Sequence, residues 1–175
     1  QKAYNTQYMT AKVVNASVFR QKNYFTINKG KKQGVQVQMA IAGPEGVIGL
    51  VENTSQHYAT VIPIINTRFH LSAKIKRNDY FGSLSWDGRS YKYAQLDDIP
   101  AYVDVFEDDT VTTTGFGSSF PEGEIVGHIS NAEKADNSAF WNIDVRLATD
   151  FKNIQSVYIL NLPLSEEQEK LEKTQ

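Results

Sequence analysis

The stretch Trp141-Asn142-Ile143-Asp144-Val145-Arg146-Leu147 indicates the fold class of this 175-residue chain. Large apolar residues occupy every second position, and polar or charged residues stand between them. Because side chains of a β-strand alternate between the two faces of a sheet, this pattern predicts a half-buried strand. We expect the four apolar side chains to point inward together, and Asp144 and Arg146 to point outward.

Similar strand-like runs fill most of the remaining chain. They are Val13–Phe19, Tyr24–Ile27, Val35–Ala40, Val47–Val51, Ala59–Ile65, Leu71–Ile75, Phe81–Trp86, Tyr91–Ala94, Thr110–Thr114, Glu124–Ile129 and Ser156–Leu160. Turn residues such as Gly43-Pro44-Glu45-Gly46 and Asp87-Gly88 separate several of them. About a dozen short strands with almost no helical periodicity predict an all-β protein. Two small β-barrel subdomains fit the length better than one large barrel.

The expected division gives a first β-barrel subdomain at residues 1–68 and a second at residues 69–164. For the strands near 140–160 two assignments stay open: they belong to the second barrel, or they return to pack in the first. Residues 165–175 form a tail, in which Ser165 and Gln168 have the spacing of a helix capping box. Because Leu171 is the only large apolar residue in that tail, we expect a short helical or frayed end. The chain begins with Gln1 rather than Met, so we expect an upstream segment.

Bulk composition restricts the class of protein. Apolar residues make up 41% of the chain and charged residues 22%, values that are ordinary for a soluble globular fold. The absence of cysteine excludes disulfides and thiolate metal sites. No apolar run approaches the roughly 18 residues that a membrane-spanning helix needs.

Charge is divided unevenly between the two halves of the sequence. Residues 1–77 hold 11 Lys and Arg against two acidic residues, whereas residues 78–175 hold 7 basic against 18 acidic residues. Such a dipolar molecule attracts partners, or copies of itself, in a preferred orientation. Alternatively, the two halves face each other within one molecule and use up part of the asymmetry.

The sequence offers no convincing catalytic or metal site. His57, His70 and His128 have no second histidine at metal-ligand spacing. The stretch 115–119, Gly-Phe-Gly-Ser-Ser, lacks the strand-to-helix turn that exposes a serine nucleophile. Gly30 and Gly34 precede a strand-like run rather than the helix of a phosphate loop, so they are more consistent with turns. We therefore expect no enzyme activity, no metal and no cofactor. An exported hydrolase is the enzyme-class alternative.

A basic cluster is the candidate interaction surface. It comprises Arg20, Lys22, Lys29, Lys31 and Lys32, which surround one predicted hairpin and its following turn. An OB-like module that binds single-stranded nucleic acid is the alternative function, with Tyr24 and Phe25 as stacking platforms. The acidic second half would repel phosphates, so we favour a protein-binding surface and expect no nucleic-acid partner.

Two stretches carry a family signature. The first comprises Thr26-Ile27-Asn28-Lys29-Gly30, Gly34-Val35, Met39 and Gly46-Val47-Ile48-Gly49-Leu50-Val51. The second comprises Asp109-Thr110-Val111, Thr113-Thr114-Gly115, Phe120-Pro121-Glu122-Gly123 and Val126-Gly127. In order and spacing the chain resembles the MreC family of rod-shape-determining proteins from about Thr10 to Leu162. It has Asp108 where the family usually has Gly and Thr114 where it usually has Ser, which brings the local turn into question.

The resemblance implies two β-barrels that follow an inner-membrane span and a dimerising helix, both outside this chain. It implies a periplasmic or extracytoplasmic location, with the full-length protein anchored by an N-terminal segment. The implied function is a non-catalytic scaffold of the cell-wall elongation machinery that maintains cell shape. The implied partners are a penicillin-binding transpeptidase, other shape and elongation proteins, and further copies of the chain in a dimer or filament.

Overall fold

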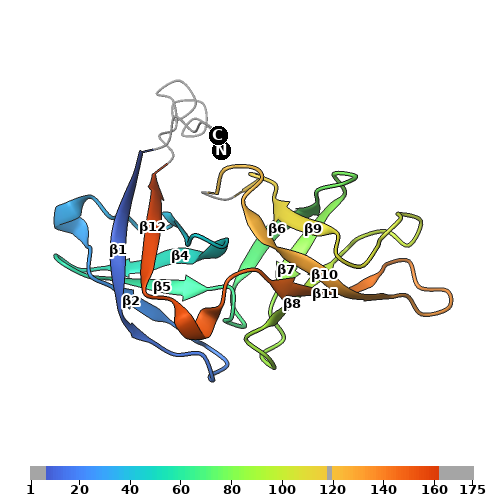
Figure 1. Ribbon diagram of the computed structural model, residues 1–175, viewed down its shortest axis with the longest axis horizontal. Helices are drawn as coiled ribbons and strands as arrows, with labels where there is room; N and C mark the ends of the chain where they lie inside the picture. Colours follow the sequence, from blue (N-terminus) through green and yellow to red (C-terminus); the bar gives the residue numbers. More distant parts are fainter. Residues whose placement is uncertain (1–6, 118–119, 162–175) are drawn as a thin grey trace, which may run out of the picture.

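The chain forms two closed β-barrels that lie side by side along the long axis of the molecule (Figure 1). The structure is a computed structural model and describes residues 7–117 and 120–161. All named strand pairs are antiparallel, and each barrel contains six strands. The two-barrel, all-β prediction is confirmed. The helix expected within 165–175 lies outside the described residues.

The first barrel combines strands from both ends of the described chain. Its strands are β1 (Gln7–Ala16), β2 (Phe25–Ile27), β3 (Ala40–Ala42), β4 (Val47–Thr54), β5 (Ala59–Pro63) and β12 (Ser156–Asn161). Their order around the barrel is β1-β12-β3-β4-β5-β2, which closes on itself. The last strand thus lies between the first and the third, and it completes the barrel.

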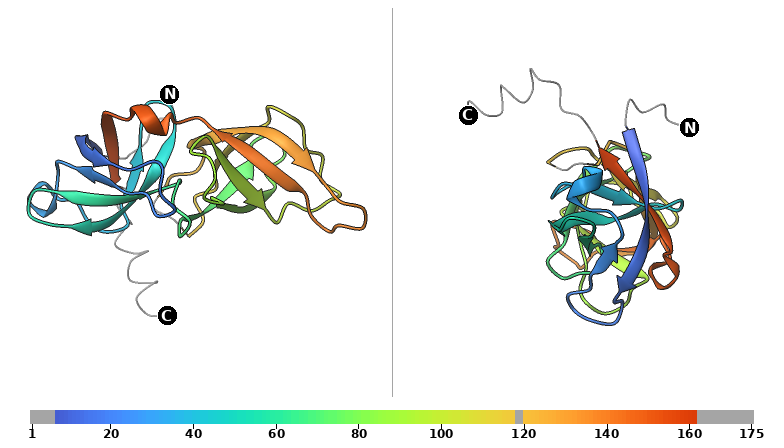
Figure 2. Two further views of the ribbon diagram at one scale, coloured as in Figure 1. Left: turned by 90° about the horizontal axis from the view of Figure 1, so that it is seen from below. Right: turned by 90° about the vertical axis from the view of Figure 1, so that its left-hand side faces the viewer.

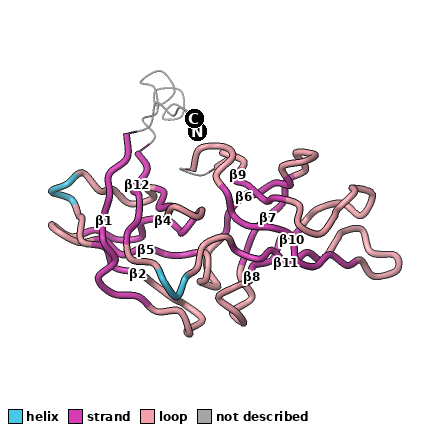
Figure 3. Tube along the Cα trace, in the orientation of Figure 1, coloured by secondary structure: helices cyan, strands magenta, loops and turns pink. Residues whose placement is uncertain are grey.

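The second barrel is continuous in sequence. Its strands are β6 (His70–Ile75), β7 (Phe81–Ser85), β8 (Tyr93–Asp97), β9 (Thr110–Thr113), β10 (Ile125–Glu133) and β11 (Asn142–Leu147). Their order is β10-β11-β8-β7-β6-β9. Of the strands near 140–160, β11 therefore lies in the second barrel and β12 in the first. Within the described residues the helical elements are two short 3₁₀ turns, η1 (Lys31–Gln33) and η2 (Phe151–Asn153) (Figure 3).

The strand that indicated the fold class has the predicted orientation. Ile143, Val145 and Leu147 of β11 are buried, whereas Arg146 is exposed. Val145 has no exposed surface and lies opposite Ile129 of β10 and Ala94 of β8. Successive side chains of β11 therefore point alternately into the barrel and toward solvent, as period-two patterning requires.

The strand predicted at Val35–Ala40 is wrong over most of its length. The chain there follows η1 and turns back, and β3 begins only at Ala40. Gln38 has a φ of 75°, a left-handed value that no regular strand adopts, and Val37 is 50% exposed. The alternation of Val and Gln arises because two turn residues, Val35 and Met39, pack into the core.

Pro63 has no N–H to donate to a neighbouring strand, yet it is accommodated within a closed barrel. It is the last residue of β5 and lies opposite Gly49 of β4 in a closed barrel. A Cβ atom on Gly49 would overlap the Ile62 carbonyl oxygen and lie 2.7 Å from the Pro63 Cα. Glycine at position 49 is thus required by the close approach of the two backbones where the ladder ends.

A buried junction joins the two barrels. Figure 2 shows the two barrels in two further views. The Nδ2 of Asn23 donates to the Ile65 carbonyl (2.7 Å), and the Nδ2 of Asn66 donates to the Asn23 carbonyl (2.8 Å). Phe151 of η2 stacks on Phe25 with 6.1 Å between ring centroids. Both asparagines and both rings are buried, so the junction is fixed by paired amides and by apolar packing.

Candidate interaction surfaces

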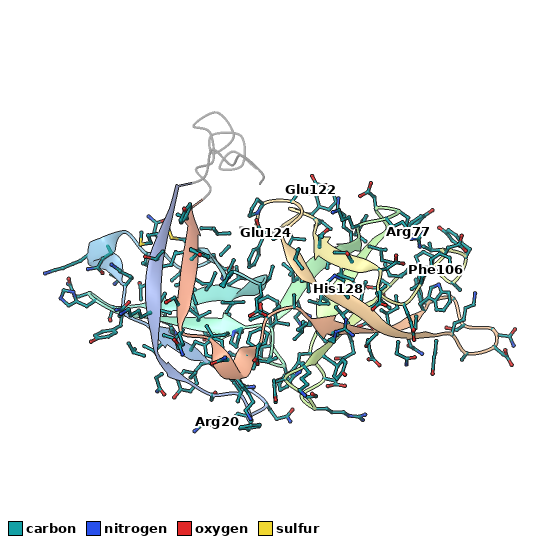
Figure 4. The ribbon with its side chains drawn as sticks, viewed as in Figure 1. Arg20, Arg77, Phe106, Glu122, Glu124 and His128 are labelled. Carbon is teal, nitrogen blue, oxygen red and sulfur yellow. The ribbon has the colours of Figure 1, made fainter. Side chains whose placement is uncertain are left out.

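The five basic residues predicted to cluster lie in two separate places. Arg20 and Lys22 belong to the loop between β1 and β2, whereas Lys29, Lys31 and Lys32 lie at and around η1. Arg20 lies close to the second barrel (Figure 4), and η1 is at the far end of the first barrel (Figure 3). Lys29 is half-buried, and the other four are exposed. Strand β2 separates the two groups because its ends point to opposite sides of the barrel.

The β1–β2 loop contacts the second barrel. The Nε2 of Gln21 donates to the Gly88 carbonyl (3.0 Å), and the Gln21 carbonyl accepts from the Thr67 N–H (2.9 Å). The ring of Phe19 meets the ring of Tyr91 edge to face, with 6.0 Å between centroids. These contacts bring Arg20 and Lys22 to the same side of the molecule as the β7–β8 loop.

The third segment at this junction runs from the end of β11 through η2. The Lys152 Nζ lies 5.5 Å from the centroid of the Phe19 ring and 5.7 Å from that of the Tyr91 ring. The Lys92 Nζ lies 5.9 Å from the Tyr91 centroid. We call this region the seam surface. It consists of Phe19, Arg20, Lys22, Arg89, Tyr91, Lys92, Arg146 and Lys152.

Four of the six cations of the seam surface were missed by reasoning from sequence. Arg89, Lys92, Arg146 and Lys152 all belong to the acidic half of the chain. They reach the seam because the second barrel presents its β7–β8 loop, and the end of β11, toward the first barrel. The three segments of this cluster are separated by more than fifty residues along the chain, so closeness in sequence cannot reveal that they meet.

A second exposed surface lies on the second barrel. We call it the aromatic face. It consists of exposed rings in two groups, Phe81 with Phe116, and Tyr80 with Tyr102 and Phe106. The rings of Phe81 and Phe116 have centroids 5.6 Å apart, and those of Tyr80 and Tyr102 6.2 Å apart. Tyr102 is 79% exposed. The adjoining stretch 97–109 contains six acidic residues and no basic residue, which makes this surface both apolar and acidic.

Arg77 holds the acidic loop in place. Its guanidinium binds the Asp109 carboxylate (Nε–Oδ1 3.0 Å) and the Asp104 carbonyl (2.8 Å), and it lies 4.6 Å from the Phe106 centroid (Figure 4). Partial burial acts to raise the pKa of Asp109, but the hydrogen bonds from Arg77 and the Phe106 N–H outweigh it, so this pKa lies below its usual value. The loop is thus ordered by a carboxylate that remains ionised.

The three histidines are far from forming a catalytic or metal site in the described part of the chain. His57 and His70 are exposed, and His128 is half-buried on β10, opposite Arg146 and Thr110. Across residues 7–117 and 120–161, no group of three His, Asp or Glu side chains is placed to hold a metal ion. Ser118 and Ser119 lie outside those ranges.

The nucleic-acid alternative loses one of its two stacking platforms. Phe25 is 1% exposed and packs inside the first barrel, so no base can stack on it. Tyr24 is half-buried, and its hydroxyl accepts a hydrogen bond from the Asn15 side chain (3.3 Å).

The fold defines a β-protein of two six-stranded barrels. The chain belongs to the family of the rod shape-determining protein MreC, because its residues 13–161 match the model of the MreC barrel core. The family resemblance read from the sequence is confirmed. Within the described residues, no helix has the length and apolar character needed to cross a membrane.

Curated relatives cover most of this chain. The cell shape-determining protein MreC of Haemophilus influenzae is 25% identical over 158 residues, which are 89% of this chain and 45% of that protein. The MreC of Listeria monocytogenes is 25% identical over 155 residues, 87% of this chain and 52% of that protein. The chain spans about half the length of the curated relatives it matches.

Solved structures show the same fold. MreC of Pseudomonas aeruginosa aligns with a TM-score of 0.81 at 19% identity, over 87% of this chain and 98% of that one. MreC of Listeria monocytogenes aligns with a TM-score of 0.82 at 25% identity, over 90% and 76%. The MreC solved in a complex with the penicillin-binding protein PBP2 from Helicobacter pylori aligns with a TM-score of 0.70 at 14% identity, over 90% and 100%.

Both departures from the family signature keep the local backbone intact. Asp108 has a φ of 66°, in the left-handed region that Gly adopts freely and Asp tolerates. The Thr114 hydroxyl accepts from the Phe116 N–H and lies 3.0 Å from the Ser72 hydroxyl. These are bonds that a serine hydroxyl also forms.

Proposed function

We propose that this chain is the barrel region of a non-catalytic scaffold in the bacterial cell-wall elongation machinery. It maintains cell shape by binding proteins of peptidoglycan synthesis and by associating with itself. Its place is the periplasmic or extracytoplasmic face of the inner membrane, where the full-length protein is anchored. The observation that carries this proposal is the match to the MreC barrel core over residues 13–161.

Two structural relatives support the partners in this proposal. The MreC of Helicobacter pylori was solved in complex with PBP2, which favours a penicillin-binding transpeptidase as a partner here. The major periplasmic domain of the cell shape-determining filament MreC shares the fold at 20% identity and a TM-score of 0.76, which favours the location and the self-association. The exposed rings of the aromatic face suit protein contacts, since protein–protein interfaces are enriched in aromatic residues.

The aromatic face is our candidate for the transpeptidase contact. Replacing Tyr102 and Phe106 together by Ser should weaken binding by roughly tenfold or more, because loss of one anchoring ring costs about 2 kcal/mol at an interface hot spot. Biolayer interferometry against the extracytoplasmic region of the transpeptidase from the same organism measures this. Tyr58→Ser, an exposed ring on the first barrel, is the matched control. No binding by the unaltered chain contradicts the proposed function, whereas equal binding by the double variant contradicts only the chosen face.

Self-association should depend on charge. If the basic half of one copy contacts the acidic half of the next, the contact is heterologous and can propagate into a filament. Reversing Lys31 and Lys32 to Glu should lower the association constant, and so should salt, because the Debye length falls from roughly 10 Å at 0.1 M to about 3 Å at 1 M. Analytical ultracentrifugation at both salt concentrations measures the effect. The variant with Arg at both positions keeps the charge and should associate normally. An association constant that changes with neither salt nor charge reversal indicates an apolar interface instead.

A further inference from the structure

The seam surface holds cations that the protein itself leaves largely unpaired. Within residues 7–117 and 120–161, Arg20, Lys22, Lys92 and Lys152 form no ion pair with a carboxylate. The other two seam cations have distant partners only, Arg89 at 4.0 Å from Asp87 and Arg146 at 3.8 Å from Asp108.

Three cations elsewhere in the described chain, Arg68, Lys74 and Arg77, are paired more closely. The Lys74 Nζ donates hydrogen bonds to Glu122 and Asp79, and these bonds, the one to Glu122 most strongly, raise the pKa of Lys74. Arg68 pairs with Glu52 at 2.9 Å. Among the described residues, Lys29, Lys31 and Lys32 at η1 also form no ion pair, so the seam is distinguished by unpaired cations beside a cleft and not by unpaired charge alone.

The seam surface contains a cleft. A cleft of about 550 Å³ opens beside Tyr91 and is bordered by Lys92, Arg146 and Lys152. Leu147 and Ala148 form part of its wall. The residues that line it, 91–92, 146–150 and 152–153, include three basic residues and one acidic residue, Asp150. The cleft therefore combines an apolar wall with a positive border.

An exposed ring contacts Tyr91, which lines this cleft. Phe19 is 78% exposed although it contacts Tyr91. The Lys152 ammonium lies near both rings at distances that allow cation–π attraction, which favours a fixed position for that charge. A ligand at the seam would meet a positioned ammonium together with an apolar side chain.

From these features we propose that the seam surface binds an extended acidic peptide segment of a partner protein. Carboxylates of the segment pair with Lys92, Arg146 and Lys152, and an apolar side chain of the segment packs against Phe19. These cations come from two separate chain segments, 87–92 and 146–153, so they match a series of carboxylates along a chain better than one small anion.

Other polyanions fit the geometry less well. Single-stranded nucleic acid binds by stacking successive bases on exposed rings, whereas in the seam surface Phe19 is exposed but Tyr91 is half-buried. An anionic membrane presents a flat surface, whereas the charges here border a concavity. The inference does not rest on the proposed function, because the aromatic face and the seam are different surfaces.

The test uses fluorescence anisotropy at low salt with the whole chain. The probe is a fluorescein-labelled peptide of Glu, Asp and Leu, and its partner probe carries Gln and Asn in place of the acids. We expect the acidic probe to bind and the amide probe to bind far more weakly. The Lys92→Glu/Lys152→Glu variant should lose roughly tenfold or more in affinity for the acidic probe.

Matched variants separate the seam from general charge effects. Lys31→Glu/Lys32→Glu makes the same change in net charge at η1 and should keep full affinity for the acidic probe. The Tyr102→Ser/Phe106→Ser variant should also keep it, which separates this site from the transpeptidase contact. Both lysines of the seam variant are exposed, so an unchanged melting curve establishes that it is folded.

Three results would overturn the inference. The first is equal binding of the acidic and amide probes. The second is equal loss of affinity in the η1 variant and the seam variant. The third is preferential binding of a single-stranded oligonucleotide, or of phosphatidylglycerol vesicles, with the acidic peptide inactive.

Discussion

A Val145→Asp protein is expected to be largely unfolded at room temperature. Val145 is fully buried in the wall of the second barrel, between β8 and β10. An unpaired carboxylate at this position costs several kcal/mol whether it ionises or takes up a proton. A domain of this size has only about 5–15 kcal/mol of stability to lose. Far-UV circular dichroism and thermal denaturation measure the outcome.

The neighbouring position provides the control for this prediction. Arg146→Asp introduces the same side chain one residue along β11, on the exposed face. Its melting temperature should stay within a few degrees of that of the unaltered protein, because surface substitutions typically change stability by about 0.5 kcal/mol or less. A Val145→Asp protein that melts like the unaltered one shows that the inward face of β11 has been misassigned.

An Asn23→Leu protein should lose about 4 kcal/mol of stability, which corresponds to roughly 10 °C in melting temperature. The buried amide of Asn23 donates to the Ile65 carbonyl, and its Oδ1 accepts from the Arg20 N–H (2.9 Å) and the Ser17 hydroxyl (3.2 Å). Leucine has a similar volume but leaves the carbonyl and the N–H without partners in the junction. The loss therefore reports unsatisfied backbone groups rather than a cavity.

Asn131→Leu is the matched control, since Asn131 is exposed on β10. Its melting temperature should change little. Amide hydrogen exchange adds a local measurement, because Asn23→Leu should speed exchange at Thr67, whose N–H bonds to Gln21 across the junction. Equal melting temperatures for Asn23→Leu and the unaltered protein would falsify the assignment of this amide as a structural clasp.

The strands could be predicted because their signals are local. The alternation in 141–147 fixes which side chains face inward, whatever the rest of the chain does. The same signal failed at Val35–Ala40, where two turn residues happen to be buried with the spacing of a strand. Period-two patterning over so few residues cannot distinguish a strand from a turn that contacts the core twice.

The candidate surfaces were harder to predict because they depend on closure of the barrels. Reasoning from sequence grouped Arg20 with Lys31 since they are close along the chain, but a strand lies between them. The true neighbours of Arg20 come from residues near 89 and 152, and only the tertiary contacts of Gln21 and Phe19 bring them there. No property of the separate segments predicts that Arg20 lies near residues 89 and 152.

The pairing of β1 with β12 has a consequence for the order in which the nascent chain folds. During synthesis the strands β1 to β5 emerge first, yet their barrel stays open until residues 156–161 have been made. The second barrel needs only strands that lie between His70 and Leu147, so it can close earlier. The barrel that is synthesised first is therefore the last to be completed.

Until then β1 and β3 present unpaired edges, which are sites where other extended chains add and aggregate. Long-range strand pairing of this kind is also slow. A cell that makes this protein must therefore shield a half-finished sheet for as long as translation of the remaining residues takes.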